Sequence, residues 1–494
     1  MSRPKRGVAG ACLALAALGG LAVASGSLAA AVHVALRTSE PKAHDTLTVA
    51  PPSIRLDFTQ AIEIQLARVA LLAADSVAIP LGPAHAADST NRAFVADILT
   101  PIGAGSYRVT WSVTSRDSHT IRGEIPFTVL AAVADTLRPA SGATSAADTV
   151  DSAAGRSSAA AADEFDARSP AYVAIRWLSF LGMLSLIGAL FFGAGVLRSV
   201  ASRDSVADTD QSVVVSRAVG LARTGAIAGA TILLVATALR LAAQVRTITG
   251  EASFDPAVMS ALLSGTAWGW AWLAQATAAI MALGVAVLGS QRVTSGGRWS
   301  AAEVLAGPIV VTLGVSAAVS GHPIAATPAG IAIAMDAAHL IAAGGWIGTL
   351  GYVAFAAVPA TAALGPDTRP RLVRDIVNAF SRFALIFAGV VVLTGLVSSW
   401  LQLRGFEPLW TTTYGRILLL KLALVAAVAV AGAYNWRVAT PRLLAAGGVA
   451  RIRLVILAEL LFAILVLGAT SVLVATPPPG EAMETAVRDE TATR

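Results

Sequence analysis

The sequence predicts two fold classes in one chain: an N-terminal all-β sandwich, followed by an all-α polytopic membrane domain of eight transmembrane helices. Three observations lead to this prediction. Of the 494 residues, 55% are hydrophobic and only 13% are charged, which is unlike an ordinary soluble protein. Short alternating apolar runs occupy residues 33–130. Apolar stretches of about 20 residues, long enough to cross a bilayer, recur from residue 170 onward.

The first 31 residues have the organisation of a secretory signal peptide. Arg3, Lys5 and Arg6 precede an apolar run, which ends in the small residues 28–31. We therefore expect residues 1–31 to be removed and the following domain to be exported. Cys12 is the only cysteine of the chain and lies within this segment. The mature protein should contain no disulfide and no thiolate metal site.

The segment after the signal peptide has the pattern of short β-strands. Apolar residues alternate with polar ones in three runs: Ile54-Leu56-Phe58, Ile62-Ile64-Leu66 and Tyr107-Val109-Trp111-Val113. These runs predict a compact antiparallel sandwich over residues 32–130. Residues 131–169 are rich in Ala, Ser, Asp and Thr and lack a sustained apolar period, which predicts a flexible linker.

The membrane domain is expected over residues 170–476, with an extracytoplasmic tail at 477–494. We place its spans near 171–197, 214–243, 266–290, 301–320, 329–359, 376–402, 414–436 and 453–475. Eight spans after an exported domain put both termini outside. Arginines gather in the loops that this topology places inside, in agreement with the positive-inside tendency. These loops also explain the pI near 10, so the charge gives no reason to expect nucleic-acid binding.

The exported domain contains a candidate metal site. Asp117 and His119 follow the predicted strand Tyr107–Val113, and residues two apart on an extended segment point the same way. His33 lies just past the expected cleavage site. Two imidazoles and a carboxylate suit Cu(II), whereas Cu(I) prefers sulfur ligands; Zn(II) is also chemically suitable. Taken singly, these residues fit a solvated turn and a disordered terminus equally well.

The domain also resembles a known family. The segments His33–Pro41, Pro51–Phe58 and above all Gly105–Gly123 are similar to the CopC copper-resistance family. That resemblance implies a cupredoxin-like (Ig-like) Greek-key sandwich that binds Cu(II) through an N-terminal histidine and the motif aspartate and histidine. Here these residues are His33, Asp117 and His119.

One departure from the family concerns the first mature residue. The family begins with the histidine itself, whereas the small-residue rule favours cleavage after Ala31, which leaves Val32 in front of His33. Cleavage after Val32 would restore the family arrangement. His44 and His85 are interpreted as exposed loop residues that do not contact metal.

Ionisable residues inside the predicted spans are the candidates for function there, because such residues are costly in a membrane. Met335, Asp336 and His339 share the fifth span, and His322 ends the fourth. We interpret these four residues as a candidate copper pathway. The other intramembrane charges are Arg176, Arg416, Lys421 and Glu459. A structural alternative is that Asp336 simply neutralises Lys421 or Arg416.

The membrane half resembles a second family. Ser320–His322, Asp336–Gly348, Ser381–Phe383 with Thr394-Gly395, and Tyr414–Lys421 are similar to the CopD copper-resistance membrane proteins. The resemblance is strongest from Gly321 onward. It implies a CopC–CopD fusion of the inner membrane that moves copper, in the inward direction.

Together, these observations lead us to expect a copper homeostasis protein that is not an enzyme. Its expected partners are copper ion, the lipid bilayer and a periplasmic copper chaperone. Two alternatives stay open. One is a haem-containing electron-transfer protein with His322 and His339 as axial ligands. The other is a copper sensor or buffer that performs no transport. The sequence leaves the energy source, the oxidation state in the membrane and the oligomeric state undetermined.

Overall fold

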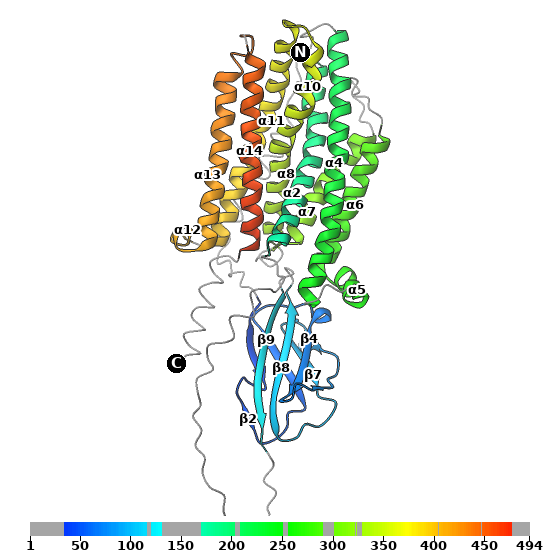
Figure 1. Cartoon of the computed structure of the whole chain (residues 1–494), viewed down its shortest axis with the longest axis vertical. Coiled ribbons are helices and arrows are strands. Elements are labelled where there is room, and N and C mark those ends of the chain that lie inside the picture. The colour runs from blue at the N-terminus through cyan, green and yellow to red at the C-terminus, as the bar shows by residue number, and fades with distance from the viewer. Residues whose placement is uncertain are drawn as a thin grey trace, which may run out of the picture. The chain divides into compact units, whose positions relative to one another are not determined.

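The structure is a computed structural model of the whole chain. It describes residues 34–115, 120–130, 169–202, 208–249, 255–289, 301–321, 323, 329–403, 405–445 and 447–476. The chain divides into two compact units. One is built around a β-sandwich and the other is helical, as Figure 1 shows, so the predicted order of fold classes is confirmed. The expected signal peptide, linker and tail lie outside the described residues.

The sandwich consists of two sheets. The first has the strand order β1 (Leu36–Glu40), β3 (Ser53–Phe58), β7 (Ala93–Asp97), β6 (His85–Ala86). The second has the order β2 (Thr46–Leu47), β9 (Thr120–Val129), β8 (Gly105–Thr114), β4 (Arg68–Ala73), β5 (Ala78–Ile79). Neighbouring strands are antiparallel, except that β2 runs parallel to β9.

The alternating apolar residues of the sequence form the core between the two sheets. Along β3, Ile54, Leu56 and Phe58 are buried while their neighbours are half-buried. The ring of Phe58 meets Trp111 of β8 edge-on, with centroids 5.5 Å apart. A period of two places every second side chain on the inner face, and burial of these side chains provides the main stabilisation of the domain.

The run 62–66 differs from its prediction as a strand. Ile62 forms an isolated bridge to Ser115, and Ile64–Leu66 is a 3-10 helix, η1. The amide of Leu66 donates to Glu63 O (2.9 Å) and that of Ala67 donates to Ile64 O (3.1 Å). The chain passes here from one sheet to the other, and a tight turn satisfies its backbone groups locally. Three alternating residues were too short a pattern to reveal this turn.

Gly123 provides space for Trp111. The two residues are opposite each other in the β8–β9 ladder. A Cβ on Gly123 would lie 2.5 Å from Trp111 Cζ2, closer than real Cβ contacts. The indole therefore lies over the glycine backbone and fills the site that a side chain would take.

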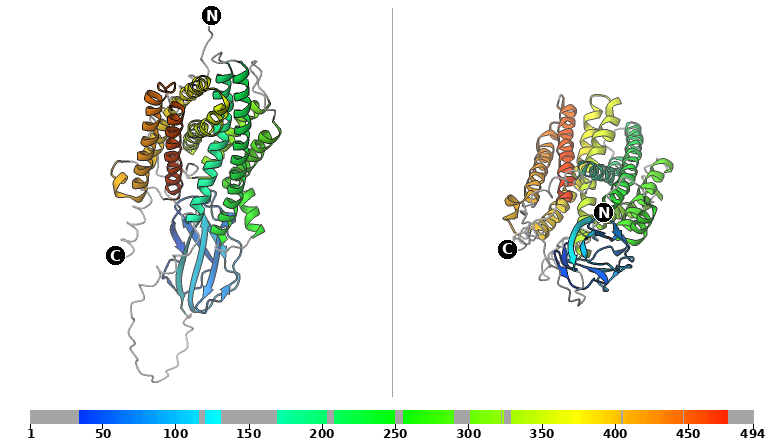
Figure 2. Two further views of the ribbon diagram at one scale, coloured as in Figure 1. Left: turned by 45° about the horizontal axis from the view of Figure 1, so that its top comes forward. Right: turned by 60° about the horizontal axis from the view of Figure 1, so that its bottom comes forward.

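The helical unit is a bundle of long helices (Figures 1 and 2). Several of these helices continue into π-helical segments. The helices of the chain are α2 (Pro170–Phe191) with η3 (Phe192–Leu197) and α3 (Arg198–Ala201); α4 (Asp208–Thr249); α5 (Pro256–Gly265); α6 (Ala267–Leu288); α7 (Ala301–Val319); α8 (Ala329–Ala343) with η5 (Gly344–Gly348), α9 (Thr349–Tyr352), η6 (Val353–Ala357), α10 (Val358–Ala360) and η7 (Thr361–Ala363); α11 (Thr368–Leu403); α12 (Pro408–Thr411); α13 (Thr413–Tyr434) with η8 (Asn435–Ala439); and α14 (Gly448–Ala475). Of these, Gln244–Leu262, the end of α4 and most of α5, belongs to the unit of the sandwich.

Seven helices in the described part of the chain are long and apolar enough to cross a membrane. They correspond to seven of the eight expected spans. The remaining expected span, 301–320, corresponds to α7, whose stretch Val304–Val319 is apolar but shorter. Several spans are thus confirmed, while eight stays a prediction. The short helix α5 was not expected, because its apolar residues were assigned to the loop between two spans.

The Gly344–Gly348 stretch allows two helices to approach closely. A Cβ on Gly348 would collide with the carbonyl oxygen of Leu184 in α2, and one on Gly188 would collide with the backbone of Gly348. Small residues let helix backbones pack directly in a membrane, where van der Waals contact replaces the hydrophobic effect. This contact fixes the span that begins with α8 against α2.

Candidate metal sites

The three candidate ligands of the N-terminal domain, His33, Asp117 and His119, lie outside the described residues. Their flanking residues are described. Val34, next to His33, is buried in the sandwich core. The Asp117–His119 segment joins β8 to β9, whose last described pair at this end is Thr114 and Thr120. The hydroxyls of these two threonines are 3.1 Å apart.

Hydrogen bonds attach the residues that flank the candidate ligands to one short segment of chain, residues 59–63. Thr59 accepts the amide of Ala35 through Oγ1 (2.9 Å) and donates its own amide to Ala35 O (2.9 Å). Glu63 donates its amide to Thr114 O (2.8 Å). Thr59 and Glu63 are four residues apart, so their separation is at most about 14 Å. The attachment points of His33 and of the Asp117–His119 segment are therefore at the same end of the sandwich.

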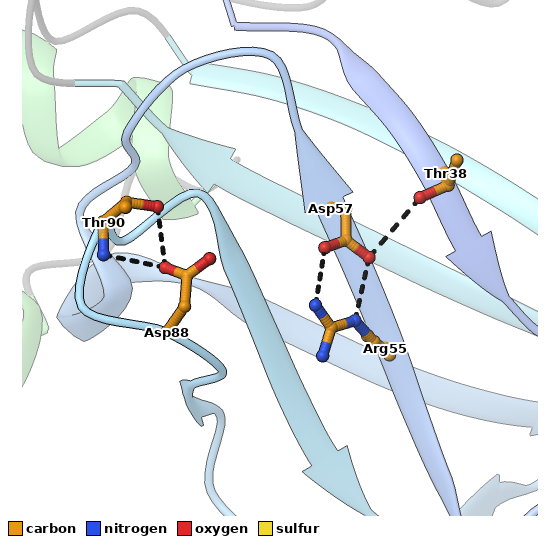
Figure 3. Close-up of polar contacts among 5 residues, drawn as sticks. All are labelled: Thr38, Arg55, Asp57, Asp88 and Thr90. Atoms are coloured by element: carbon orange, nitrogen blue, oxygen red, sulfur yellow. Dashed lines mark hydrogen bonds and ion pairs between the residues drawn. The ribbon is translucent and has the colours of Figure 1, made fainter.

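Other polar side chains of the sandwich already have partners (Figure 3). Arg55 donates to both carboxylate oxygens of Asp57, with distances of 2.8 and 3.0 Å. This hydrogen-bonded pair raises the pKa of Arg55. Asp88 Oδ1 accepts from the hydroxyl (2.7 Å) and the amide (2.8 Å) of Thr90, which lowers the pKa of Asp88. Both carboxylates are thus engaged in hydrogen bonds within the sandwich.

The two remaining histidines of this domain are both exposed. His44 occupies a turn with a positive φ of 64°, as expected for a loop residue. His85 belongs to the short edge strand β6, so its assignment to a loop was wrong. Its two-residue strand is too brief for a sequence pattern to reveal. Its Nδ1 lies 3.4 Å from Pro83 O.

In the membrane unit, His339 of α8 is paired with Thr394 of α11. His339 Nδ1 lies 2.8 Å from Thr394 Oγ1. The threonine hydroxyl also lies 2.7 Å from the carbonyl oxygen of Val390, one turn earlier on its own helix. A hydroxyl has one hydrogen to donate, and the carbonyl can only accept. Thr394 therefore donates to the backbone carbonyls of its own helix, Val390 O at 2.7 Å and Val391 O at 3.3 Å, and accepts from His339.

This arrangement determines the tautomer of His339. With the proton on Nδ1, Nε2 would be the nitrogen that binds a metal ion; the backbone of Val391 also hydrogen-bonds to this ring. Gly395 lies beside the same ring, because a Cβ there would be 3.5 Å from His339 Cε1. A histidine whose other nitrogen is held by an oxygen acceptor is the usual form of a metal-ligating histidine.

Asp336 and Lys421 accompany His339. Lys421 of α13 is near enough to interact electrostatically with both Asp336 and His339, although no ion pair within 4.0 Å forms between Lys421 and Asp336. All three side chains are half-buried, and Met335 is buried. Arg416 is exposed and instead donates to Trp410 O (3.2 Å), so it is not the partner of Asp336 in this structure.

The group lies at one depth in the bundle. His339 is ten residues from the start of α8, Thr394 is nine from the end of α11, and Lys421 is eight from the start of α13. At a rise of 1.5 Å per residue, His339, Thr394 and Lys421 are each about 12–15 Å along the axis from the helix end just named. His322, the fourth candidate of the pathway, lies outside the described residues.

Two further intramembrane charges have separate surroundings. The Arg176 guanidinium lies over the Tyr172 ring, 4.6 Å from its centroid. Glu459 of α14 is buried and accepts a hydrogen bond from Asn435 Nδ2. Within the described ranges, no three His, Cys, Asp or Glu side chains gather as a metal site would require. Asn435 was missed by sequence reasoning, since an amide at the end of a span resembles an ordinary loop residue.

Comparison with known proteins agrees with both halves of the chain. Residues 36–130 match the family model described as CopC domain, residues 165–330 match Copper resistance protein D-like, N-terminal domain, and residues 374–473 match Copper resistance protein D. The chain belongs to the CopC–CopD fusion type of copper resistance proteins.

Individual relatives match most of the chain or its CopC-like part alone. Copper transport protein CutJ of Bacillus subtilis (strain 168) is 25% identical over 411 residues, which are 82% of this chain and 68% of that protein. Copper resistance protein C of Xanthomonas campestris pv. juglandis is 30% identical over 114 residues, 22% of this chain and 89% of that protein. Copper resistance protein C of Escherichia coli is 29% identical over 109 residues, 21% of this chain and 86% of that protein.

Solved structures also match the CopC-like part. CopC from Methylosinus trichosporium OB3b covers 22% of the chain at 24% identity, with a TM-score of 0.20. PcoC, a methionine rich copper resistance protein from Escherichia coli, covers 20% of the chain at 28% identity, with a TM-score of 0.18.

Proposed function

We propose that this protein binds Cu(II) in its exported sandwich and moves copper inward across the inner membrane through its helical domain. The observation that carries the proposal is the His339–Thr394 pair, which holds an imidazole ring in one orientation inside the bundle. A polar side chain in a span is costly, so it is retained where it is used.

The exported site would consist of His33, Asp117 and His119. Support comes from the attachment of both flanks to the same end of the sandwich. The donor set of imidazole and carboxylate suits Cu(II) better than Cu(I). The similarity to proteins named Copper resistance protein C agrees with this assignment.

In the membrane domain, copper would pass His339 Nε2 with Asp336 beside it, and Met335 and His322 would complete the path. Asp336 carries the opposite charge to a copper ion and is one helical turn from His339. Lys421 would balance Asp336 when no ion is present. The name of the relative CutJ, copper transport protein, supports transport over simple binding.

The cellular arrangement follows from the same proposal. The signal peptide would direct residues 32–130 outside, both termini would be extracytoplasmic, and the linker would keep the sandwich near the membrane entrance at high local concentration. A periplasmic copper chaperone could load the site. The protein would act without enzymatic chemistry.

Copper uptake by proteoliposomes tests this function most directly. The purified protein is reconstituted, copper is added outside, and accumulated metal is measured against empty liposomes. Uptake above this background supports transport. Binding without uptake would instead establish a sensor or buffer. A Soret band in the purified protein would favour a haem-containing electron-transfer protein.

Titration of the sandwich tests the exported site. Asp117→Ala combined with His119→Ala should abolish high-affinity Cu(II) binding by residues 33–130. Trp111 is the one tryptophan in this segment, so its fluorescence provides an internal probe. The isolated segment is a reasonable sample, because proteins named Copper resistance protein C match it over almost their whole length. Unchanged affinity of the double variant would refute the site.

A further inference from the structure

Glu459 and Asn435 form a buried polar pair that the copper pathway does not use. Glu459 is 2% exposed and lies on α14, 11 residues from its start at Gly448. Asn435 is 8% exposed and begins the π-helical segment η8 at the end of α13. These two helices lie side by side in Figures 1 and 2 and are in extensive contact.

The pair is far from the His339 group. Asn435 is 14 residues beyond Lys421 on the same helix, which is about 21 Å along its axis. Glu459 therefore lies toward the opposite end of the bundle, in the half that the proposed topology places on the cytoplasmic side. The π-helical turn is made by bonds from Thr440 to Asn435 O, through its amide (2.9 Å) and its hydroxyl (2.8 Å). Such turns are frequent at functional sites.

The hydrogen bonds of the pair are incomplete as long as Glu459 is ionised. Asn435 Nδ2 donates to Glu459 Oε1, whereas Asn435 Oδ1 is buried and has no partner. A carboxylate has no hydrogen to donate, so it cannot satisfy this oxygen in either orientation of the amide. A buried acceptor without a donor is costly, and this one adjoins a buried carboxyl.

No described lysine, arginine or histidine forms an ion pair with Glu459. Several titratable groups on the packed elements are engaged elsewhere: Tyr352 hydrogen-bonds to Ser185 Oγ (3.0 Å), Arg437 lies over the Trp436 ring (5.3 Å), Arg382 donates to Asn378 O (3.4 Å) and Arg176 lies over Tyr172. Tyr434 of α13 and Arg451 and Arg453 of α14 are exposed. A buried carboxylate without a counter-ion is strongly disfavoured.

We propose that Glu459 and Asn435 form a proton-binding site. Glu459 holds a proton on one oxygen and donates it to Asn435 Oδ1, while its other oxygen accepts from Asn435 Nδ2. The two side chains then form a closed pair of hydrogen bonds, in which the orphaned acceptor is satisfied and no charge is buried. Gly432 leaves room at this point, because a Cβ there would be 3.7 Å from Glu459 Oε2.

The proton of this site is exchangeable with water. Its release would leave a carboxylate that attracts a cation, and intramembrane carboxyls that gain and lose protons are the usual relays of pumps and transporters. The proton-binding claim depends only on the Glu459–Asn435 geometry. Its link to copper movement rests on the proposed function.

Infrared spectroscopy of the full-length purified protein tests the site without copper. The wild type should show a carboxylic-acid C=O band at neutral pH that shifts in D₂O and is absent from Glu459→Gln. The glutamine variant should fold, because its amide can make both hydrogen bonds to Asn435. If Glu459→Gln instead loses a carboxylate band and keeps the acid band of the wild type, Glu459 is ionised and the proposal is overturned. An acid band that does not shift in D₂O would overturn the exchange.

Asn435→Ala provides the second variant. Removal of the amide should keep the acid band but move it to higher frequency, because the O–H loses its acceptor. An unmoved band would overturn the pairing. Ser471→Ala is the matched control, since Ser471 is buried on the same helix and its hydroxyl bonds only to Leu467 O (2.9 Å). This control should leave the band unchanged. Because no copper is present, failure here is distinguishable from failure of the transport proposal.

Discussion

Replacement of Thr394 by valine should reduce copper transport by loosening His339. Valine keeps the shape of threonine, so no cavity forms, but it removes the oxygen that lies 2.8 Å from His339 Nδ1. Thr394 is only 3% exposed, so water cannot readily replace this acceptor, and the ring would keep only its hydrogen bond to the Val391 backbone. An unsatisfied buried N–H costs about 1–3 kcal/mol. The imidazole should avoid this cost by rotating or by moving its proton to Nε2. The first change misplaces Nε2, and the second removes the lone pair with which Nε2 would bind copper.

The expected loss follows from the behaviour of residues that orient metal ligands. Their substitution typically lowers metal affinity or activity about 10- to 100-fold. We expect a decrease of this size in the initial rate of copper uptake by proteoliposomes at low copper concentration. Thr394→Ser is the matched control, because it keeps the hydroxyl and should transport close to wild type. Equal uptake by Thr394→Val and wild type would refute the orienting role.

Three further predictions concern separate parts of the chain. Gly123→Ala places a Cβ 2.5 Å from Trp111 Cζ2 and should lower the unfolding free energy of the sandwich by about 1–3 kcal/mol in urea denaturation; an unchanged midpoint would contradict the packing argument. His339→Ala should lower copper accumulation in cells while the protein is still inserted at normal levels, and normal accumulation would return this histidine to a structural role. Thr90→Val should destabilise the sandwich at pH 7 but less at about pH 2.5, because it removes the hydroxyl hydrogen bond, which contributes most to the lowered pKa of Asp88 and favours its ionised form, so this contribution is lost as the pH falls through the carboxyl range. A loss that does not depend on pH would contradict this prediction.

The division of the chain into a sandwich and a helical domain was predictable, because each part has one dominant pattern of apolar residues. Alternation at Ile54, Leu56 and Phe58 marks a face buried between sheets, and all three residues are in the core. Runs of apolar residues marked seven helices that are long enough to cross a membrane. Such patterns extend over many residues, so a single residue that departs from the pattern does not change the predicted element.

The features that sequence reasoning missed depend on contacts between distant residues. His339 was a candidate from its position alone, but the hydrogen bond that orients its ring became known only once Thr394, 55 positions away, was found beside it. Asn435 gave no signal, because its role depends on Glu459 across the helix pair. The turn at Ile64–Leu66 was also missed, since it arises from the passage of the chain between two sheets rather than from local pattern.

Electron paramagnetic resonance of the purified protein with one equivalent of Cu(II) tests the central claim most directly. The account predicts a tetragonal cupric spectrum with nitrogen superhyperfine splitting from His33 and His119, which is lost when Asp117 and His119 are both replaced by alanine. A spectrum of copper without nitrogen ligands at stoichiometric loading would contradict it.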